Sequence, residues 1–349
     1  MSDLLSVLLV GGSGFLGLHL VQQFYTHCPN TEIHIFDIRP IPDTISKYFT
    51  FDKKKVIFHK GDLTSETDVK RAIDQSKCDV VVHSASPIHG MSQDIYHKVN
   101  VVGTQVLIKV AKALAVKALV YTSSAGVVFN GEDVFNGDEL WPYPEVHMDG
   151  YNETKATAEQ AVMRANCADL LTVCLRPAGI FGPGDRQLVP GLRTAARLGQ
   201  SKFQLGDNNN LFDWTYAGNV ADAHVLAAQK ILQAEYDPKL GGETFFVTND
   251  CPVYFWTLAR TVWKADGHID KYNIVLSRPV ALVAGYLSEY VSKILKKEPG
   301  LTPFRVKITC ATRYHDITKA KEILGYTPAV SLEDGIKHTL DWIYETHEK

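Results

Sequence analysis

Apolar residues in the first half of the chain follow two alternating patterns. Short runs rich in Val, Ile and Leu, of the kind that is buried on both faces of a sheet, alternate with longer stretches in which apolar residues recur at helical spacing. This alternation predicts an α/β fold with a doubly wound parallel sheet that helices cover on both faces. The expected strands are residues 4–10, 32–37, 55–59, 79–83, 118–123 and 171–176, and the expected helices begin near Phe15, Glu66, Asn100 and Tyr151.

The alternation weakens after Arg176, where a stretch rich in Gly and Pro begins. We therefore predict a nucleotide-binding domain in residues 1–180, with returning elements around residues 215–250. Residues 181–349 are expected to form mainly a smaller, mixed substrate-binding lobe. The length agrees with this division, because single hydrophobic cores stop growing near ~250–300 residues and this chain has 349.

The second half of the chain contains further local signals. An Ala-rich helix with an asparagine at its start is expected over residues 219–234, and a strand that returns to the sheet is expected over residues 242–247. Near the C-terminus, the run that begins at Gly325 (Gly-Tyr-Thr-Pro) is expected to end one helix. Ser331 and Asp334 are then expected to cap the next helix.

Composition argues against several classes of protein. A net charge of -3 shows no basic excess, so nucleic acid is not an expected partner. The cysteines form no Cys-x-x-Cys pair and the histidines have no ligand spacing, so we expect neither a disulfide framework nor a metal site. We expect the chain to face the cytosol, because the N-terminal run MSDLLSVLLVGGSG lacks the cationic start of a signal peptide and is too short to span a bilayer.

A glycine-rich turn, GGSGFLG at residues 11–17, follows the first expected strand and opens a helix. Its spacing matches Gly-x-Gly-x-x-Gly, in which a bare backbone approaches a pyrophosphate and the helix N-terminus donates N–H groups to it. Asp37 ends the second strand about 20 residues later, where an acid that binds the cofactor ribose is expected. A carboxylate there repels a 2′-phosphate, so we favour NAD; the nearby Arg39 leaves NADP open.

A tyrosine and a lysine stand four residues apart in the stretch YNETK, Tyr151 to Lys155. On a helix these positions share a face, so the phenol and the ammonium can point to a common spot. Ser123 and Ser124 end the fifth strand, and carboxyl ends of parallel strands share a rim with the glycine turn. Adjacent strand residues face opposite ways, so only one of these serines is expected to reach the site.

Together these motifs resemble the extended short-chain dehydrogenase/reductase family, whose Ser...Tyr-x-x-x-Lys set matches Ser124, Tyr151 and Lys155. The resemblance implies a Rossmann-type fold in which Lys155 and the positive nicotinamide ring together bring the pKa of Tyr151 nearer to working pH, while Ser123 is a satisfied buried hydroxyl. It also implies a set of cofactor-binding residues in the turns after the strands. These residues are Gly11, Gly14, Phe15, Leu16, Gly17, Asp37, Asp62, Leu63, Ser84, Ala85, Ser86, Tyr151, Lys155, Pro177, Ala178 and Ile180.

Two of these assignments have open alternatives. Asp62, in the run GDLT, is well placed for an adenine contact, and Thr64 as a helix cap explains the same run. The group that recognises a substrate anion is not identified by the sequence. Arg186, Arg193 and Arg305 are each expected to be ordinary surface residues.

Longer runs, YTSSAGVVFNG and FDWTYAGNVADAHVLAAQ among them, resemble the members of this family that act on 3β-hydroxysterols with a 4α-carboxylate. The resemblance implies oxidation at C3 with loss of the carboxylate as CO₂, the C4-demethylation step of sterol biosynthesis, and this needs no metal. A 3β-hydroxysteroid dehydrogenase/isomerase and a nucleotide-sugar epimerase or dehydratase are alternatives. A regulatory NAD(P) sensor is the alternative outside enzymes, and the tyrosine–lysine pair disfavours it.

Residues 278–297 form an apolar stretch that Glu289 and Lys293 interrupt and that ends in a basic pair. Two readings stay open: an amphipathic helix in the plane of a membrane surface, or a helix buried in the substrate lobe. The family resemblance implies peripheral attachment at the cytosolic face of the endoplasmic reticulum membrane. It also allows a homodimer through helices of the nucleotide-binding domain, and a scaffold with other enzymes of sterol C4 demethylation.

Overall fold

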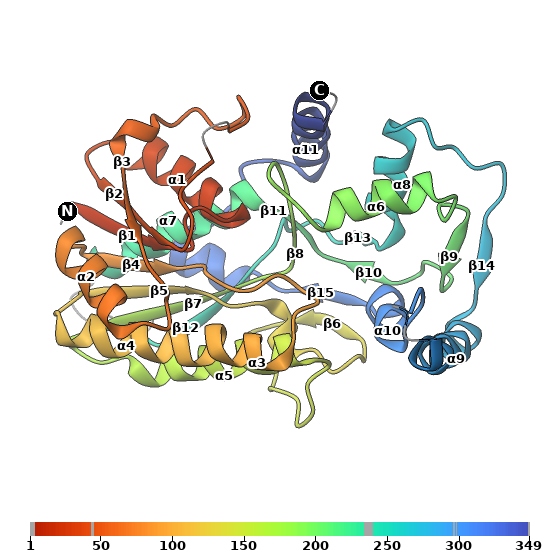
Figure 1. Ribbon diagram of the computed structural model, residues 1–349, viewed down its shortest axis with the longest axis horizontal. Helices are drawn as coiled ribbons and strands as arrows, with labels where there is room; N and C mark the ends of the chain where they lie inside the picture. The colour runs from red at the N-terminus through yellow and green to blue at the C-terminus, as the bar shows by residue number, and fades with distance from the viewer. Residues whose placement is uncertain (1–3, 43–44, 234–239, 296, 298, 348–349) are drawn as a thin grey trace.

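The computed structural model describes residues 4–42, 45–233, 240–295, 297 and 299–347. Lys296 of the expected basic pair and Ala234, the expected last residue of the Ala-rich helix, lie outside the described residues. The strands of the central sheet run toward a second lobe, which is formed mainly by residues after 180 and lies on the right in Figure 1.

A seven-stranded parallel sheet forms the centre of the first lobe, in the order β12-β7-β5-β4-β1-β2-β3. The order runs outward from β1 in both directions, so the doubly wound α/β prediction is confirmed. Each expected strand is present, with ends shifted by one or two residues. The strands are β1 (Ser6–Val10), β2 (Glu32–Asp37), β3 (Val56–Lys60), β4 (Val80–His83), β5 (Ala118–Thr122), β7 (Leu171–Pro177) and β12 (Glu243–Val247).

Helices cover both faces of the sheet, as Figure 1 shows. One face packs against α1 (Phe15–His27) and α7 (Ala217–Gln233), and the other against α2 (Glu66–Ser76), α4 (Thr104–Ala113) and α5 (Gly150–Ala165). The third helix begins earlier than Asn100. The chain is helical from α3 (Gln93–Tyr96) through a π-helical segment (His97–Gly103) into α4.

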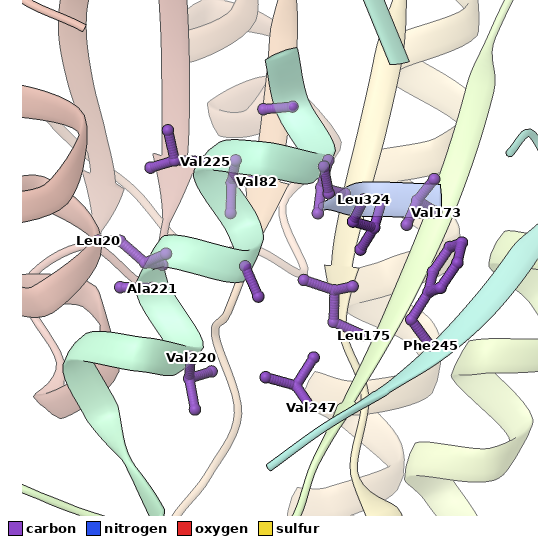
Figure 2. Packing of buried hydrophobic residues seen from close by; sticks show 14 of the residues in the cluster. Leu20, Val82, Val173, Leu175, Val220, Ala221, Val225, Phe245, Val247 and Leu324 are labelled. Atoms are coloured by element: carbon purple, nitrogen blue, oxygen red, sulfur yellow. The ribbon is translucent and has the colours of Figure 1, made fainter. Parts of the chain in front are cut away.

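Alternation along each strand builds two cores, one on each face of the sheet. In β1, Val7 and Leu9 join the core on the α1 and α7 side, while Leu8 and Val10 join the opposite core. Figure 2 shows the first core, in which Val220, Ala221 and Val225 of α7 lie against side chains of α1 and the strands. Burial on both faces explains why these strands are continuously apolar.

The Ala-rich helix α7 begins at Ala217, so the expectation that Asn219 caps it is wrong. Asn219 is buried in the first turn. Its amide donates to the Val330 carbonyl at 2.8 Å and accepts the Val330 N–H at 3.0 Å. The side chain therefore ties α7 to the segment before the last helix. That helix is capped as expected, with the Ser331 hydroxyl accepting the Asp334 N–H at 3.0 Å.

The second lobe is built from short strands and helices. β6 (Val134–Gly137) belongs to the first half of the sequence but lies in this lobe, where it pairs with β15 (Arg313–His315). Segments far apart in sequence therefore form one small sheet. The other strands are β8 (Gly179–Phe181), β9 (Phe203–Leu205), β10 (Leu211–Phe212), β11 (Trp214–Tyr216), β13 (Val253–Tyr254) and β14 (Ile274–Leu276). The helices are α6 (Leu188–Arg197), α8 (Trp256–Ala265), α9 (Arg278–Leu295), α10 (Pro303–Cys310) and α11 (Leu332–His347).

Helix α9 lies at the edge of this lobe and packs on α10 (Figure 1). Among its residues only Ala281 and Gly285 are buried. Most of its large apolar side chains are 48–67% exposed and Leu282 is half-buried, so the reading of this segment as a buried helix is wrong. Among the described residues, no helix has the length and apolar character needed to cross a membrane.

Candidate active site

A cavity of about 1030 Å³ lies at the carboxyl ends of the central strands and extends into the second lobe. Every residue that the sequence singled out for catalysis or cofactor binding lines it, and their roles stay predictions. The set is Ser124, Gly11, Gly14, Phe15, Leu16, Gly17, Asp37, Asp62, Leu63, Ser84, Ala85, Ser86, Tyr151, Lys155, Pro177, Ala178 and Ile180.

The glycine turn brings bare backbone to one end of this cavity. Gly11 has a φ of 86°, and a Cβ there would lie 2.7 Å from the Ala85 nitrogen. A Cβ on Gly17 would collide with the Gly11 carbonyl oxygen. Gly14 precedes α1 without a side-chain cap, so the first N–H groups of α1 have no side chain to satisfy them. The turn fits a pyrophosphate.

Asp37 stands at the end of β2, where the sequence placed a ribose-binding acid. Its carboxylate accepts the Ser13 N–H at 3.2 Å and the Arg39 N–H at 3.3 Å. Burial raises the pKa of Asp37 and those hydrogen bonds oppose the shift. The Ser13 hydroxyl is buried and has no partner among the described residues, so polar capacity remains for a bound hydroxyl.

Asp62 is exposed at the cavity and accepts the Thr64 N–H at 2.8 Å and the Thr64 hydroxyl at 2.9 Å. The N-cap of α2 is Ser65, whose hydroxyl accepts the Asp68 N–H at 3.3 Å. The alternative in which Thr64 caps the helix is therefore wrong. Thr64 instead closes a turn with Asp62.

Tyr151 and Lys155 lie one turn apart near the start of α5. The Lys155 ammonium donates to the Thr122 carbonyl at 2.5 Å and lies 4.4 Å from the centre of the Tyr121 ring. Burial lowers the pKa of Lys155 to about 7, and Glu159 opposes the shift. The centre of the Tyr151 ring lies 4.1 Å from the centre of the His89 ring.

Lys155 by itself does not lower the pKa of Tyr151 in the structure. Burial raises the pKa of Tyr151 to about 12, the Asp149 charge adds to this, and a hydrogen bond with Ser86 opposes it. The physical reason is that Lys155 is directed at Thr122, so its charge does not offset the desolvation of the phenol.

Both serines after β5 line the cavity, contrary to the expectation that only one would. The regular strand ends at Thr122, so strict alternation no longer applies to them. The Ser124 hydroxyl accepts the Gly126 N–H at 3.0 Å. The Ser123 hydroxyl is buried without a partner among the described residues, so the prediction of a satisfied Ser123 is wrong.

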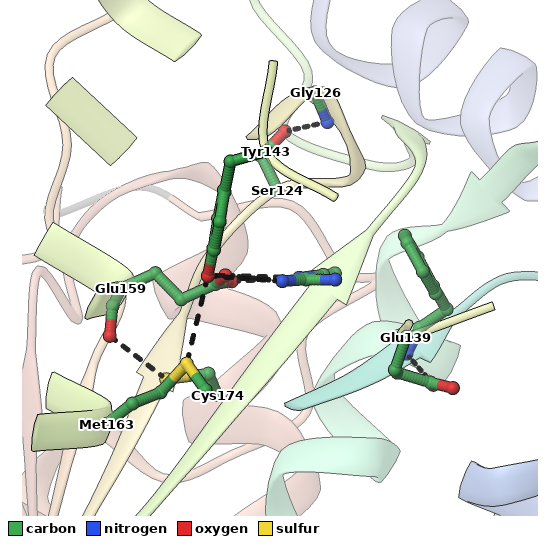
Figure 3. Close-up of polar contacts among 9 residues, drawn as sticks. Ser124, Gly126, Glu139, Tyr143, Glu159, Met163 and Cys174 are labelled. Carbon is green, nitrogen blue, oxygen red and sulfur yellow. Dashed lines mark hydrogen bonds and ion pairs between the residues drawn. The ribbon is translucent and has the colours of Figure 1, made fainter. Parts of the chain in front are cut away.

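A buried ion pair involves Glu159, whose polar contacts Figure 3 shows. Glu159, one turn after Lys155 on α5, accepts from Arg176 of β7 at 2.7 Å, and both side chains are almost fully buried. The Tyr143 hydroxyl also donates to Glu159. Glu159 thus places a compensated negative charge near the Lys155 ammonium.

Sequence reasoning missed the far end of the cavity, which is largely apolar. The cavity there is lined by aromatic and aliphatic side chains from separate segments of the chain, with one arginine among them. These residues are Phe129, Phe212, Trp214, Phe255, Phe304, Ile308 and Arg313. No local motif marks them, because β10, α10 and β15 come together only in the folded chain.

The three arginines considered from sequence have different places. Arg193 pairs with Asp266 at 2.5 Å, and Arg305 donates to the Gly300 carbonyl at 2.7 Å. Arg186 is exposed on the cavity wall. Within the described ranges, no group of three or more His, Cys, Asp or Glu residues could hold a metal ion.

Burial of Lys155 gives folding a defined pH dependence. The unfolded chain keeps this proton up to a pH of ~10.4, whereas burial lowers the folded pKa to about 7. Between these values the unfolded state binds the extra proton, so this position adds stability as pH rises, by at most ~1.4 kcal/mol per unit.

We therefore expect the free energy of unfolding of the wild type, minus that of Lys155→Met, to increase from about pH 7 to pH 9 in urea titrations. A difference that stays flat over this range would show that Lys155 keeps its proton in the folded protein.

Comparison with known proteins agrees with this site. The sequence model of the family described as 3-beta hydroxysteroid dehydrogenase/isomerase matches residues 8–278. A decarboxylating sterol-4-alpha-carboxylate 3-dehydrogenase from Candida albicans is 72% identical, covering 98% of this chain and 99% of the relative. The enzyme of the same name from Saccharomyces cerevisiae is 67% identical, covering 99% of each.

A solved structure with the same fold is a dTDP-glucose 4,6-dehydratase from Bacillus anthracis in complex with NAD. It has a TM-score of 0.74 and 18% identity and covers 99% of this chain and 98% of its own. At that identity the likeness supports the fold alone. The family match over most of the chain, with two relatives aligned almost end to end, confirms the resemblance expected from the sequence: the chain belongs to the 3-beta hydroxysteroid dehydrogenase/isomerase family.

Proposed function

We propose that the protein oxidises the 3β-hydroxyl of a 4α-carboxysterol with NAD⁺ and that the C4 carboxylate leaves as CO₂. One observation carries this proposal: a single cavity of about 1030 Å³ joins the glycine turn, the Ser124, Tyr151 and Lys155 set, and a largely apolar end. The names of the relatives at 72% and 67% identity give the same reaction.

The first lobe would hold the cofactor. The glycine turn and the first N–H groups of α1 bind the pyrophosphate, and Asp37 accepts from the adenosine ribose. When bound, oxidised NAD would supply a positively charged nicotinamide ring as the hydride acceptor. Ser123 and Ser124, which both line the cavity, would hold polar groups where cofactor and substrate meet.

Tyr151 takes the proton of the 3β-hydroxyl as the hydride leaves C3, so that the alcohol becomes a ketone. With its pKa raised to about 12, Tyr151 is a weak base in the protein alone. A positive charge close to the phenol is therefore required for the reaction, and Lys155 must turn from Thr122 or act through the ribose to contribute. Ser124 donates a hydrogen bond to the substrate oxygen and fixes its direction.

Loss of CO₂ needs no further catalytic group. The new C3 ketone is β to the carboxylate, so the electrons of the breaking C4–carboxyl bond move into the ketone and form an enolate. Donors at the C3 oxygen would stabilise that enolate, and Tyr151 and Ser124, which line the same cavity, would supply them.

The test of this proposal is the simultaneous release of NADH and CO₂ from a 4α-carboxysterol in detergent. Turnover of a simple 3β-hydroxysteroid or a UDP-sugar without turnover of the acid would mean that the substrate class is wrong. Binding of NAD⁺ without turnover of any of these would instead support a sensor.

The choice of NAD over NADP is tested at Asp37. We expect the wild type to prefer NAD⁺, because the half-buried carboxylate repels a 2′-phosphate. Asp37→Ser should lower kcat/KM for NAD⁺ by roughly tenfold, the value of one hydrogen bond to a charged group, and should improve use of NADP⁺. Arg39→Ala is the matched control, and an equal preference in wild type and Asp37→Ser would contradict the assignment.

We also propose that the exposed face of α9 rests on the surface of the endoplasmic reticulum membrane, from which a sterol would enter. Its apolar side chains include Val283 and Leu287, which are 61% and 60% exposed, and Lys293 follows near its end.

Replacing Val283 and Leu287 together by Glu should weaken binding to anionic vesicles by roughly tenfold or more. Each apolar side chain contributes part of the ~1.5–3 kcal/mol that its full burial in the membrane would give, and the Glu side chains do not. The control is Ile269→Glu, at an exposed apolar residue outside α9. Equal vesicle binding by all three proteins in a flotation assay would refute this contact.

A further inference from the structure

Arg313 lies on β15 in the small sheet between β10 and β6, and its side chain lines the largely apolar end of the cavity. The guanidinium carbon is 4.2 Å from the centre of the Phe129 ring and 4.6 Å from that of the Phe212 ring. Two aromatic contacts hold the guanidinium in place. They do not satisfy its N–H groups, which lie in the guanidinium plane.

Within the part of the chain that the structure describes, no hydrogen bond or ion pair reaches the Arg313 guanidinium, and its Nε is buried without a partner. Burial with no compensating charge lowers the pKa of Arg313 to about 9. Such a group is costly to keep in the folded chain, because breaking or omitting one side of a buried ion pair leaves the other side uncompensated.

Neighbouring charged groups are already occupied. His315, two residues further along β15, contacts Asp213 at 3.1 Å. Asp185, on the cavity wall, accepts three backbone N–H groups, from Gln187, Leu188 and Val189. Arg313 thus differs from Arg193 and Arg305, which have partners, because it lines the cavity and no described group accepts from its guanidinium.

The missing partner has a defined chemistry. Five N–H donors in a planar fork match the two oxygens of a carboxylate, and a largely apolar surrounding strengthens such a pair. We propose that Arg313 binds the C4 carboxylate of the substrate and so selects carboxysterols among 3β-hydroxysterols. This inference rests on the proposed function, since it names the group that recognises the acid at that same cavity.

The contact between Arg313 and the carboxylate distinguishes the substrate from the product. The substrate enters with the carboxylate that Arg313 binds, and the product leaves without it. Arg313 therefore adds affinity for the substrate only, which limits inhibition by the product.

The test compares two sterols, a 4α-carboxy-3β-hydroxysterol and the same 3β-hydroxysterol with a 4α-methyl group. Arg313→Gln should lower kcat/KM for the acid by roughly 10- to 100-fold, as expected for loss of a charge-assisted bidentate contact. Its kcat/KM for the methyl sterol should change by less than about threefold, and NADH affinity should not change. Arg305→Gln, at a solvated arginine outside the cavity lining, is the control.

Arg313→Met, which keeps a long side chain between the two rings, repeats the test if the Gln variant folds poorly. Equal losses on both sterols would mean that Arg313 is structural, and no loss on the acid would also overturn the inference. A wild type that does not oxidise the acid at all is a different result, because it refutes the proposed function itself.

Discussion

Tyr151→Phe is expected to lower kcat by roughly 10²–10⁴-fold, the usual contribution of a positioned proton-transfer group. The ring contacts with His89 and Tyr96 survive the change, so the fold and the cofactor site should be preserved. Stopped-flow or steady-state NADH formation from a 4α-carboxysterol measures the rate, and a fluorescence titration with NADH measures cofactor binding.

The pH profile separates a proton-transfer role from a structural one. Since the pKa of Tyr151 is raised to about 12, wild-type kcat/KM should increase with pH through the alkaline range, and this limb should vanish in Tyr151→Phe. Tyr272→Phe, at an exposed tyrosine, is the control. A variant that retains more than about a tenth of wild-type kcat would rule out Tyr151 as the base.

Glu159→Gln is expected to cost ~3–5 kcal/mol of folding free energy, because it leaves the Arg176 charge uncompensated in the core. Arg176 and Glu159 are 3% and 0% exposed, and their shortest contact is 2.7 Å. Urea unfolding measures the loss. The matched control is Glu153→Gln on the same helix, an exposed position where a change within ~0.5 kcal/mol is expected.

Replacing Glu159 should also affect the candidate active site, by changing the pKa of Lys155. Its charge opposes the lowering of the Lys155 pKa, so removing it should lower that pKa further. A Glu159→Gln protein as stable as Glu153→Gln would mean that the pair adds no net stability, the outcome known for some buried ion pairs.

The central sheet could be predicted because its information is local. Continuous apolar runs flanked by helical periodicity give both the strands and their burial on two faces, as in β1 with Val7 and Leu8 in opposite cores. Most of the residues proposed for cofactor binding and catalysis follow directly after strands, and parallel strands bring such segments to one rim, where Tyr151 and Lys155 of α5 join them.

The features that could not be predicted from the sequence depend on contacts between distant segments. Arg313 reaches the cavity because β15 pairs with β6, which begins at Val134. The raised pKa of Tyr151 follows from burial and from the direction of the Lys155 side chain, and neither is visible in a Tyr-x-x-x-Lys spacing. Asn219 is of a residue type that often caps helices, but it lies inside the first turn of α7, where its amide forms hydrogen bonds with Val330.

The order of the strands in the sheet also affects how the protein folds during its synthesis. β7 lies between β5 and β12, and β12 (Glu243–Val247) is synthesised only after the part of the second lobe from β8 to β11. Until α7 and β12 leave the ribosome, the nascent first lobe has an open strand edge and an uncovered apolar face. A truncated chain ending near residue 180 would therefore be an aggregation-prone client of chaperones, even though it contains the whole glycine turn and the tyrosine–lysine pair.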